Sequence, residues 1–255
     1  QELWKSDGTE SGTVMVKQFL SLSYSGVNVG KLKDVNGTLF FVAPDDIHGE
    51  ELWKSDGTET GTVMVKDINP GTDSSRIDEL TNVNGTAYFR ADDGIHSYEL
   101  WKSDGTESGT MMVKDINGSG ESSPRYFTPI DGTVFFSADD GVAGHELWKS
   151  DGTETGTELV LDIKPGSSSS GPKDLIIFNG EIFFSAYESY CRELWKSDGT
   201  ASGTVPVEDS FMPPDLCEPE ELTNVNGVLY FRGDKYDFEL CLVSWACMPG
   251  KIFHY

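Results

Sequence analysis

Short apolar runs separated by turn residues follow one another along most of the chain. The clearest set is ELTNV at 79–83, TAYFRA at 86–91, ELWKSDG at 99–105 and TMMVKDI at 110–116. Only Asn84-Gly85 separates the first two runs, and both central residues of a type I′ hairpin turn need positive φ, which Asn and Gly tolerate. No segment keeps a helical period over more than ten residues. The pattern therefore predicts a unit of four antiparallel strands.

This unit repeats. The octapeptide ELWKSDGT begins at residues 2, 51, 99, 146 and 193, and a degraded copy, ELCLVSWA, begins at 239, so the spacing is 46 to 49 residues. An Asn-Gly or Asp-Gly turn recurs at 36–37, 84–85, 131–132, 179–180 and 226–227. Four-stranded units of this length, repeated along a chain, are typical of β-propeller blades. We expect one all-β propeller domain over residues 1–255.

The hairpins can be counted to predict how the ring closes. Hairpins of the first and second strands are expected at about 32–43, 78–91, 126–138, 173–186 and 220–232. Hairpins of the third and fourth strands are expected at about 2–16, 51–68, 99–116, 146–163 and 193–207. The regular hairpin at 2–16 needs a partner, and only 220–232 lacks one. We therefore predict five blades, the last shared by both ends of the chain, which would remove free strand edges. The ELC at 239–241 keeps six blades, one of them partial, as the alternative, and 233–255 is a divergent tail.

Leucine and tryptophan occupy consecutive positions in each third strand, at 3/4, 52/53, 100/101, 147/148 and 194/195. Consecutive strand residues point to opposite faces, so each sheet is apolar on both faces and packs on two neighbours. We interpret these tryptophans as core between blades rather than as a shelf for stacking sugars.

The turn that follows each third strand reads SDGTxxGT. Its aspartates are Asp7, Asp56, Asp104, Asp151 and Asp198. Calcium requires six to eight oxygen ligands, and each turn supplies a single aspartate. Asp and Thr side chains commonly bond nearby backbone N–H groups in tight turns, so we interpret these aspartates as structural. No cofactor is expected, with weak calcium binding as the open alternative.

The net charge limits the classes of partner that the protein can bind. The chain has 43 acidic and 19 basic residues, a net charge of -24 and a pI near 4.3. Such a surface repels nucleic acid and anionic membranes and attracts cations and basic proteins. No run of 18 apolar residues predicts a membrane span. Gln1 suggests a mature end left by a secretory signal, where glutamine cyclises to pyroglutamate, so we expect a secreted protein. Sequons at Asn36, Asn84 and Asn117 would allow glycosylation.

The four cysteines, Cys191, Cys217, Cys241 and Cys247, all lie in the last quarter of the chain. An even number fits two disulfides in a secreted protein, and the absence of a C-x-x-C pair argues against zinc. Since the tail has lost the repeat, we expect both bridges to tether it, pairing Cys191 and Cys217 with Cys241 and Cys247 in either order.

No catalytic motif is present: the sequence has no G-x-S-x-G, H-E-x-x-H, Walker or dinucleotide pattern. His48, His96 and His145 stand just before a third strand in successive repeats, and His254 is near the end. Ligands on separate sheets about 10 Å apart cannot share one metal, so these histidines are interpreted as loop residues. The same loops carry the candidate ligand-binding residues, the acidic pairs Asp45-Asp46, Asp92-Asp93 and Asp139-Asp140. The alternative for these pairs is turn chemistry.

The ELWKSDGTxxGT motif with its LTNVNGT-like hairpins resembles the ELWxxDGT repeat family, found mainly in large secreted bacterial proteins. The resemblance covers nearly everything up to residue 232 and implies a propeller, but no activity or site residues. The short length and the cysteine-rich tail depart from the usual members.

Together these observations predict a secreted, monomeric, non-enzymatic propeller. Its acidic loop face would bind cationic ligands or basic protein partners at a site near the propeller channel. A glycan-binding lectin is the first alternative. A sialidase-like hydrolase is the second, and would need the arginines to cluster; they are Arg76, Arg90, Arg125, Arg192 and Arg232.

Overall fold

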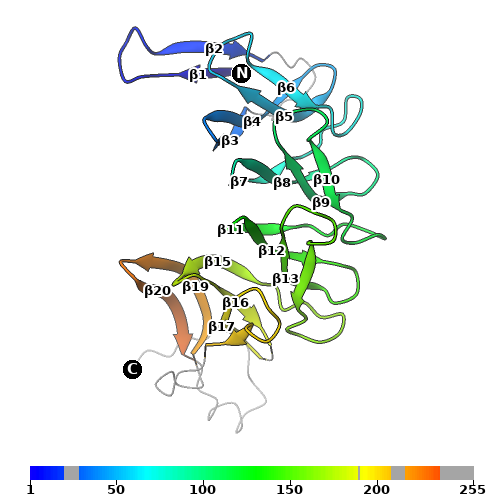
Figure 1. Ribbon diagram of the computed structural model, residues 1–255, viewed down its shortest axis with the longest axis vertical. Coiled ribbons are helices and arrows are strands. Elements are labelled where there is room, and N and C mark those ends of the chain that lie inside the picture. Colours follow the sequence, from blue (N-terminus) through cyan, green and yellow to red (C-terminus); the bar gives the residue numbers. More distant parts are fainter. Residues whose placement is uncertain (20–28, 189, 208–215, 236–255) are drawn as a thin grey trace.

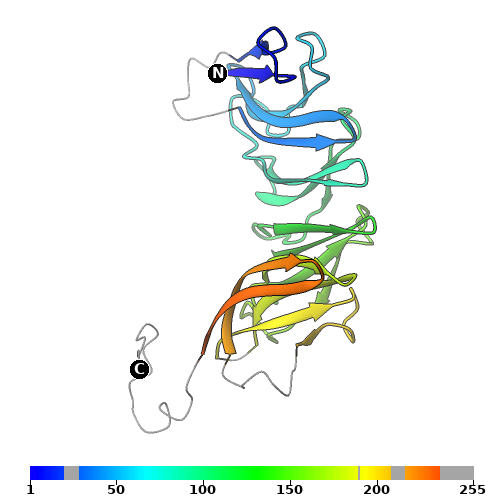
Figure 2. The ribbon, with the colours of Figure 1, turned by 90° about the vertical axis from the view of Figure 1, so that its left-hand side faces the viewer.

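The computed structural model describes residues 1–19, 29–188, 190–207 and 216–235. Within these ranges it contains twenty β-strands and no helix, and so no helix long and apolar enough to cross a membrane. The strands form successive sheets that follow one another along a crescent, with the two end hairpins at its opposite tips (Figures 1 and 2). The predicted all-β class is confirmed.

Four sheets are complete blades of four antiparallel strands in sequence order. Blade 1 consists of β3 (Gly30–Val35), β4 (Thr38–Asp45), β5 (Gly49–Ser55) and β6 (Val63–Lys66). Blade 2 consists of β7 (Asp78–Val83), β8 (Thr86–Asp92), β9 (Tyr98–Ser103) and β10 (Met111–Lys114). Blade 3 consists of β11 (Arg125–Ile130), β12 (Thr133–Asp139), β13 (His145–Ser150) and β14 (Glu158–Leu161). Blade 4 consists of β15 (Lys173–Phe178), β16 (Glu181–Tyr187), β17 (Arg192–Ser197) and β18 (Val205–Pro206). These are blades of a β-propeller, with the predicted repeat.

The remaining strands form two separate hairpins. The N-terminal hairpin pairs β1 (Glu2–Lys5) with β2 (Val14–Gln18), and the C-terminal hairpin pairs β19 (Leu216–Val225) with β20 (Val228–Lys235). The expectation that they share one blade is wrong for this structure. Each hairpin packs on its adjacent blade, and blades 1 and 4 lie at opposite ends of the crescent, so the two edges do not meet (Figure 1). The alternative partial blade at 239–241 lies outside the described residues.

The turns between first and second strands have the predicted type I′ geometry. Their first residues all have φ between 47° and 56°, and the following glycines have φ between 79° and 85°; they are Asn36-Gly37, Asn84-Gly85, Asp131-Gly132, Asn179-Gly180 and Asn226-Gly227. A two-residue turn of this type matches the right-handed strand twist and fixes the register of each hairpin.

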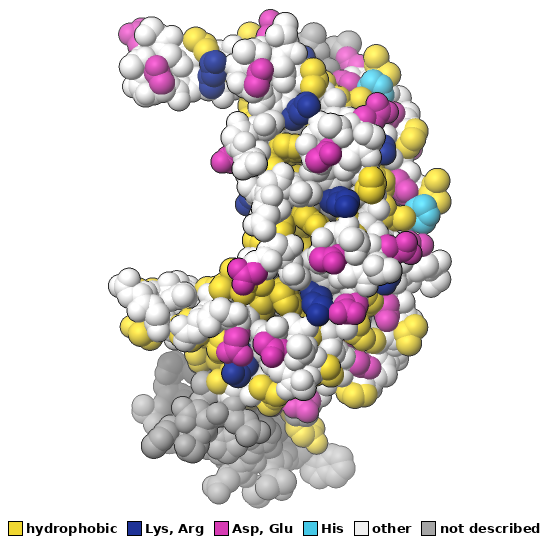
Figure 3. Space-filling view, in the orientation of Figure 1, with side chains coloured by type: hydrophobic (Ala, Val, Ile, Leu, Met, Phe, Trp, Pro, Cys, Tyr) yellow, Lys and Arg dark blue, Asp and Glu magenta, His cyan; other side chains and the backbone are white. Residues whose placement is uncertain are grey.

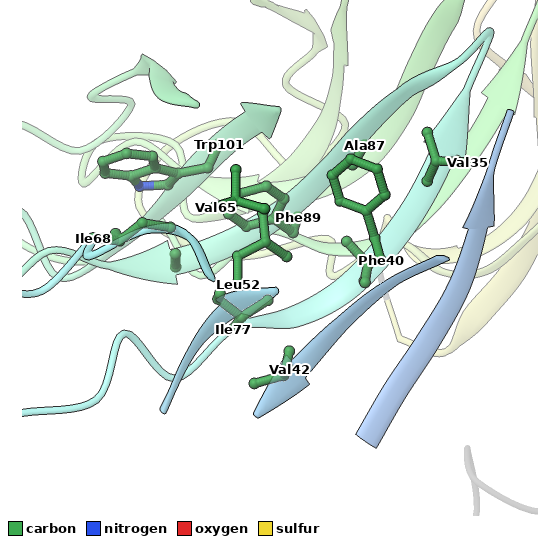
Figure 4. Close-up of a cluster of buried hydrophobic side chains, with 12 residues drawn as sticks. Val35, Phe40, Val42, Leu52, Val65, Ile68, Ile77, Ala87, Phe89 and Trp101 are labelled. Carbon is green, nitrogen blue, oxygen red and sulfur yellow. The ribbon is translucent and has the colours of Figure 1, made fainter. Parts of the chain in front are cut away.

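The core lies between blades. Leu52 of blade 1 packs with Phe89 and Trp101 of blade 2 in one cluster, while Leu100, the neighbour of Trp101, belongs to the next cluster (Figure 4). The opposite orientation of Leu100 and Trp101 is therefore confirmed. Because each sheet buries both faces, stability depends on the stacking of neighbours, as in other repeat proteins.

The tryptophans confirm this packing in the complete blades only. Trp53, Trp101, Trp148 and Trp195 are 4–8% exposed. Trp4 of the N-terminal hairpin is 54% exposed, because no blade lies against that face of the hairpin. Its prediction as core is therefore wrong in this structure.

The predicted disulfide pairing is also wrong. Cys191 bonds to Cys217, with a Cα–Cα distance of 5.6 Å, and the tail cysteines lie outside the described residues. Cys191 directly precedes β17 and Cys217 lies in β19, which packs on blade 4, so the bridge joins that blade to the next sheet. By register, Cys217 replaces Ser170 of the preceding connection. The sequence could not show this, because the pairing depends on which strands pack together.

Candidate functional site

Two kinds of loop share one face of the crescent. The mid-blade loops join the second strand of a blade to the third, and the interblade connections join the fourth strand to the next blade. Since the strands alternate in direction, both emerge at the same end of the sheets, while the SDGTxxGT turns emerge at the other. The sequence-predicted acidic residues all lie in or beside the mid-blade loops.

The acidic pairs close these loops. Asp93 accepts hydrogen bonds from the N–H groups of Ile95 and His96 at 2.9 and 2.8 Å. Asp45 and Asp140 accept the equivalent pairs of N–H groups. Asp45-Asp46 is therefore shifted by one residue against the other two pairs, because the loop-closing acid is the first of the pair in blade 1 and the second in blades 2 and 3.

Asp92 and Asp139 bind the next loop glycine. Each accepts an N–H bond, from Gly94 at 2.8 Å and from Gly141 at 2.7 Å. Five of the six candidate acids thus form hydrogen bonds within their own loops, as expected if these residues stabilise turns rather than bind a ligand. Each of the five keeps oxygen lone pairs for further partners. Asp46, the sixth, is exposed at the position that Gly94 holds in blade 2.

Two mid-blade loops contain a histidine–aspartate pair. His48 Nδ1 lies 2.8 Å from Asp45 Oδ2, and His96 Nδ1 lies 2.8 Å from Asp93 Oδ2. The hydrogen bond to Asp93 raises the pKa of His96. Burial acts to raise the pKa of Asp93, but the bonds from His96 outweigh it and lower that pKa. These loops therefore hold positive charge beside their acids at a higher pH than free histidine would.

His145 does not belong to this set. It is the first residue of β13, opposite Asp139, at the position that Tyr98 holds in blade 2. Burial lowers the pKa of His145. The predicted equivalence of three histidines is therefore wrong, because blade 3 has Ala143 where the other two loops have a histidine.

Each mid-blade loop also presents one exposed apolar residue at its tip. These residues stand two positions after the loop-closing acid in blades 1 to 3, and at the matching place in blade 4; they are Ile47, Ile95, Val142 and Tyr190, 68–89% exposed. Figure 3 shows hydrophobic side chains beside histidine and acidic side chains along the convex edge of the crescent. Sequence reasoning missed this row, because a single apolar residue in a polar loop gives no periodic signal until the loops are superposed.

A buried glutamate fixes the interblade connections beneath these loops. Glu99 accepts the N–H of Ile116 at 2.9 Å, and the N–H and hydroxyl of Ser122 at 3.0 and 2.6 Å. Glu51 and Glu146 make equivalent bonds. Burial raises the pKa of Glu51 to about 8 and that of Glu99 to about 6, and the donated hydrogen bonds oppose the rise. The loop face therefore stands on a rigid base.

A polar hollow of about 460 Å³ opens between blades 1 and 2 on this face. Its lining comes from both loop types and comprises Glu50, Asn69, Asp73, Ser74, Arg76, Asp92 and Gly94. Arg76 lies 3.8 Å from Asp92, while Glu50 and Asp73 add two further carboxyl groups. Burial raises the pKa of Glu50. With three acids and one arginine, the hollow favours a cationic group of a ligand.

The aspartate turns at the opposite end are alike in all five copies. Asp104 Oδ1 accepts the N–H of Thr106 at 2.8 Å and its hydroxyl at 2.7 Å, and Thr106 Oγ1 accepts the N–H of Gly109 at 2.9 Å. A Cβ added to Gly109 would lie 2.1 Å from Asp104 Oδ1, so the turn requires glycine there. The aspartate is used within its own turn.

Metal-ligand groups and arginines were the remaining candidates for a catalytic or metal site in the described ranges. No group of three or more His, Cys, Asp or Glu residues there could hold a metal ion. Three of the arginines pair locally: Arg90 with Asp78, Arg192 with the carbonyl oxygens of Gly171 and Ser185, and Arg232 with Glu220. These three arginines lie in different sheets.

Comparisons with known proteins add little beyond the fold. No protein-family model matches the chain, and no curated protein matches it. Solved structures that resemble it include a puromycin hydrolase, with 16% identity over 88% of this chain and 35% of that chain and a TM-score of 0.47. A second is a prolyl endopeptidase, with 11% identity over 76% of this chain and 28% of that chain and a TM-score of 0.44.

A third is an α-L-arabinofuranosidase from Clostridium thermocellum, with 16% identity over 69% of this chain and 71% of that chain and a TM-score of 0.32. The chain spans about a third of the length of the puromycin hydrolases and prolyl endopeptidase. At these identities and scores the likenesses give no information about activity.

Proposed function

We propose that the protein is a non-enzymatic binding module whose mid-blade loop face binds a basic protein partner. The observation that carries this proposal is the repeated loop itself. The copies in blades 1 to 3 each set an exposed apolar residue beside acidic groups, on a base fixed by hydrogen bonds. Loops positioned by a rigid scaffold commonly carry binding function.

The loop composition favours a peptide chain over a free ion or a sugar. Carboxylates attract lysine and arginine, and the net charge of -24 would speed their approach. The apolar tips would bury the aliphatic side chains of the partner, which a small cation lacks. Four of the tryptophans that a lectin would use for stacking are buried between blades. Repetition in four blades adds multivalency, since linked weak contacts raise overall affinity.

Titration calorimetry with synthetic peptides tests this proposal. One peptide contains lysine and leucine, and the second contains lysine and serine at the same length and charge. We expect the leucine peptide to bind more tightly, and both to weaken as salt is raised, because exposed charges are screened. The double variant Ile95→Ser/Val142→Ser should weaken the leucine peptide about tenfold, given the apolar area lost.

Charge is tested with Asp92→Asn/Asp139→Asn, which keeps the side-chain oxygen that accepts the N–H of Gly94 or Gly141. This variant should bind both peptides more weakly than the unsubstituted protein does. The matched control is Glu59→Gln/Glu107→Gln, which removes the same charge from exposed positions on the aspartate turns. The proposal is wrong if neither peptide binds, or if the control pair weakens binding as much as the loop pair.

A further inference from the structure

The two end hairpins are complementary halves of one blade. In each complete blade the second strand pairs with the third, for example β8 with β9. In the described part of the chain, β20 is a second strand paired only with β19, and β1 is a third strand paired only with β2. Each hairpin therefore exposes the edge that the other would cover. Such unpaired edges are templates for strand addition.

The register of this missing pair follows from the four complete blades. A phenylalanine of the second strand always faces the tryptophan of the third; the pairs are Phe41–Trp53, Phe89–Trp101, Phe136–Trp148 and Phe184–Trp195. Counted from the Asn-Gly turn, Phe231 is the matching residue of β20, and Trp4 is the matching residue of β1. Pairing in register would therefore set Phe231 opposite Trp4, and Tyr230 opposite Lys5.

The exposed side chains of the two hairpins also fit a pairing of β20 with β1. In blade 2, Trp101 packs on blade 1, whereas Val83 and Tyr88 pack on blade 3, and all three are buried. The equivalent residues of the hairpins are about half exposed: Trp4 at 54%, Val225 at 48% and Tyr230 at 58%. A joined blade would bury Trp4 against blade 4, and Val225 and Tyr230 against blade 1.

A lysine contact is missing at the same place. In the N-terminal hairpin and blades 1 to 3, a lysine of the third strand donates to a glycine carbonyl in the aspartate turn of the next sheet, at 2.7–2.9 Å. The pairs are Lys5–Gly57, Lys54–Gly105, Lys102–Gly152 and Lys149–Gly199. Lys196, the next in the series, bonds to Glu181 of its own sheet at 3.2 Å. The matching acceptor for Lys196 is the carbonyl of Gly8 in the N-terminal hairpin.

We propose that a second copy of the chain completes this blade, so that the N-terminal hairpin of one copy adds to β20 of the other. In the structure the two hairpins lie at opposite tips of the crescent, with four blades between them, so they do not meet within one copy (Figures 1 and 2). Two crescents facing each other would form both joints at once. Each contact joins two different patches of the protein, and two copies that face each other make the contact twice and form a closed dimer. The contact also continues the existing interface between neighbouring blades.

Crosslinking in mixtures tests whether the joint forms between copies. A Lys5→Cys variant is mixed with a Tyr230→Cys variant and treated with a short bismaleimide, because directly opposite residues lie about 5 Å apart across a strand pair. We expect a crosslinked dimer containing one of each. The unsubstituted protein gives the background from its own cysteines. A mixture of Glu107→Cys with Tyr230→Cys is the control, since Glu107 is exposed in the aspartate turn of blade 2, away from the proposed joint.

The double variant Lys5→Cys/Tyr230→Cys separates the alternatives. A crosslink between chains supports the proposal. A crosslink within one chain would show that the ring closes on itself and would overturn it, as would yields no higher than the control.

Sedimentation provides an independent measurement. We expect a mass of two or more copies at micromolar concentration, and at least tenfold weaker association for Trp4→Ser. Trp4 is exposed in the single copy, so the variant should keep its fold, and Ile95→Ser should associate normally. A single-copy mass at every concentration would overturn the proposal.

Discussion

The loops at the two ends of the same sheets differ in how much their residues vary from one blade to the next. At one end, the aspartate turns repeat the same hydrogen bonds five times, from Asp7 to Asp198, with the same residue types. At the other end, the mid-blade loops of blades 1 to 3 keep their closing bonds but change the residues around them, with histidine or alanine following the tip. A turn whose side chains form hydrogen bonds only within that turn stabilises the fold. A loop that satisfies its backbone and still exposes different side chains is available for binding.

The largest expected effect on stability concerns the buried glutamates beneath the mid-blade loops. Folded Glu51 has a pKa raised to about 8, against an ordinary value of 4.5, so the folded protein retains a proton that the unfolded chain has released. The stabilising contribution is present below pH 4.5 and is lost as the pH rises to 8, with a loss on the order of 5 kcal/mol. Urea unfolding of the protein and of Glu51→Gln at several pH values measures this, and the variant should show a shallower decline.

An equal decline for both proteins would show that Glu51 does not titrate in this range. Glu59→Gln, on an exposed aspartate turn, is the control and should follow the unsubstituted protein.

The next effect concerns the buried part of an aspartate turn. Thr110 Oγ1 lies 2.7 Å from Ser103 Oγ and donates to Thr106 O at 2.7 Å, and Thr110 is fully buried. Thr110→Val leaves those oxygens without this partner, so the free energy of unfolding should fall by about 1–3 kcal/mol. Peptide binding at the opposite end should not change. A loss of binding without a loss of stability would reverse the roles assigned to the two ends.

A smaller effect is expected from the aspartate itself. Asp104→Ala removes the bonds to Thr106 and should lower stability by about 1 kcal/mol, as for other lost turn and cap bonds. Asp104→Asn keeps an acceptor oxygen and should lower it less. Thermal unfolding with and without EDTA distinguishes the alternative, because a large fall in Tm with the chelator would indicate bound calcium.

The smallest effect on stability is expected at a loop tip. Ile95 is 81% exposed, so Ile95→Ser should change the free energy of unfolding by less than about 0.5 kcal/mol. The same substitution should weaken the leucine-containing peptide measurably. If it destabilises the protein as much as Asp104→Ala does, the tip is part of the fold and not a surface for a partner.

The sequence predicted the ten hairpins well, because their signals are local. Asn84-Gly85 specifies its own turn, and the alternating faces of Leu100 and Trp101 follow from strand geometry. The arrangement of the two ends was not predictable in the same way. Whether the N-terminal hairpin meets β20 depends on the accumulated rotation between blades, which no single repeat encodes. The Cys191–Cys217 bond and the register of Asp45 likewise depend on how a strand and a loop are placed against their neighbours.

Hydrogen exchange with the lysine–leucine peptide bound decides which end of the sheets binds the partner, since it compares both ends in one experiment. If the mid-blade loops bind the peptide, amide exchange should slow around Ile47, Ile95 and Val142 and should stay unchanged in the aspartate turns around Asp56, Asp104 and Asp151. Protection of the aspartate turns, with the mid-blade loops unchanged, would contradict the proposed function.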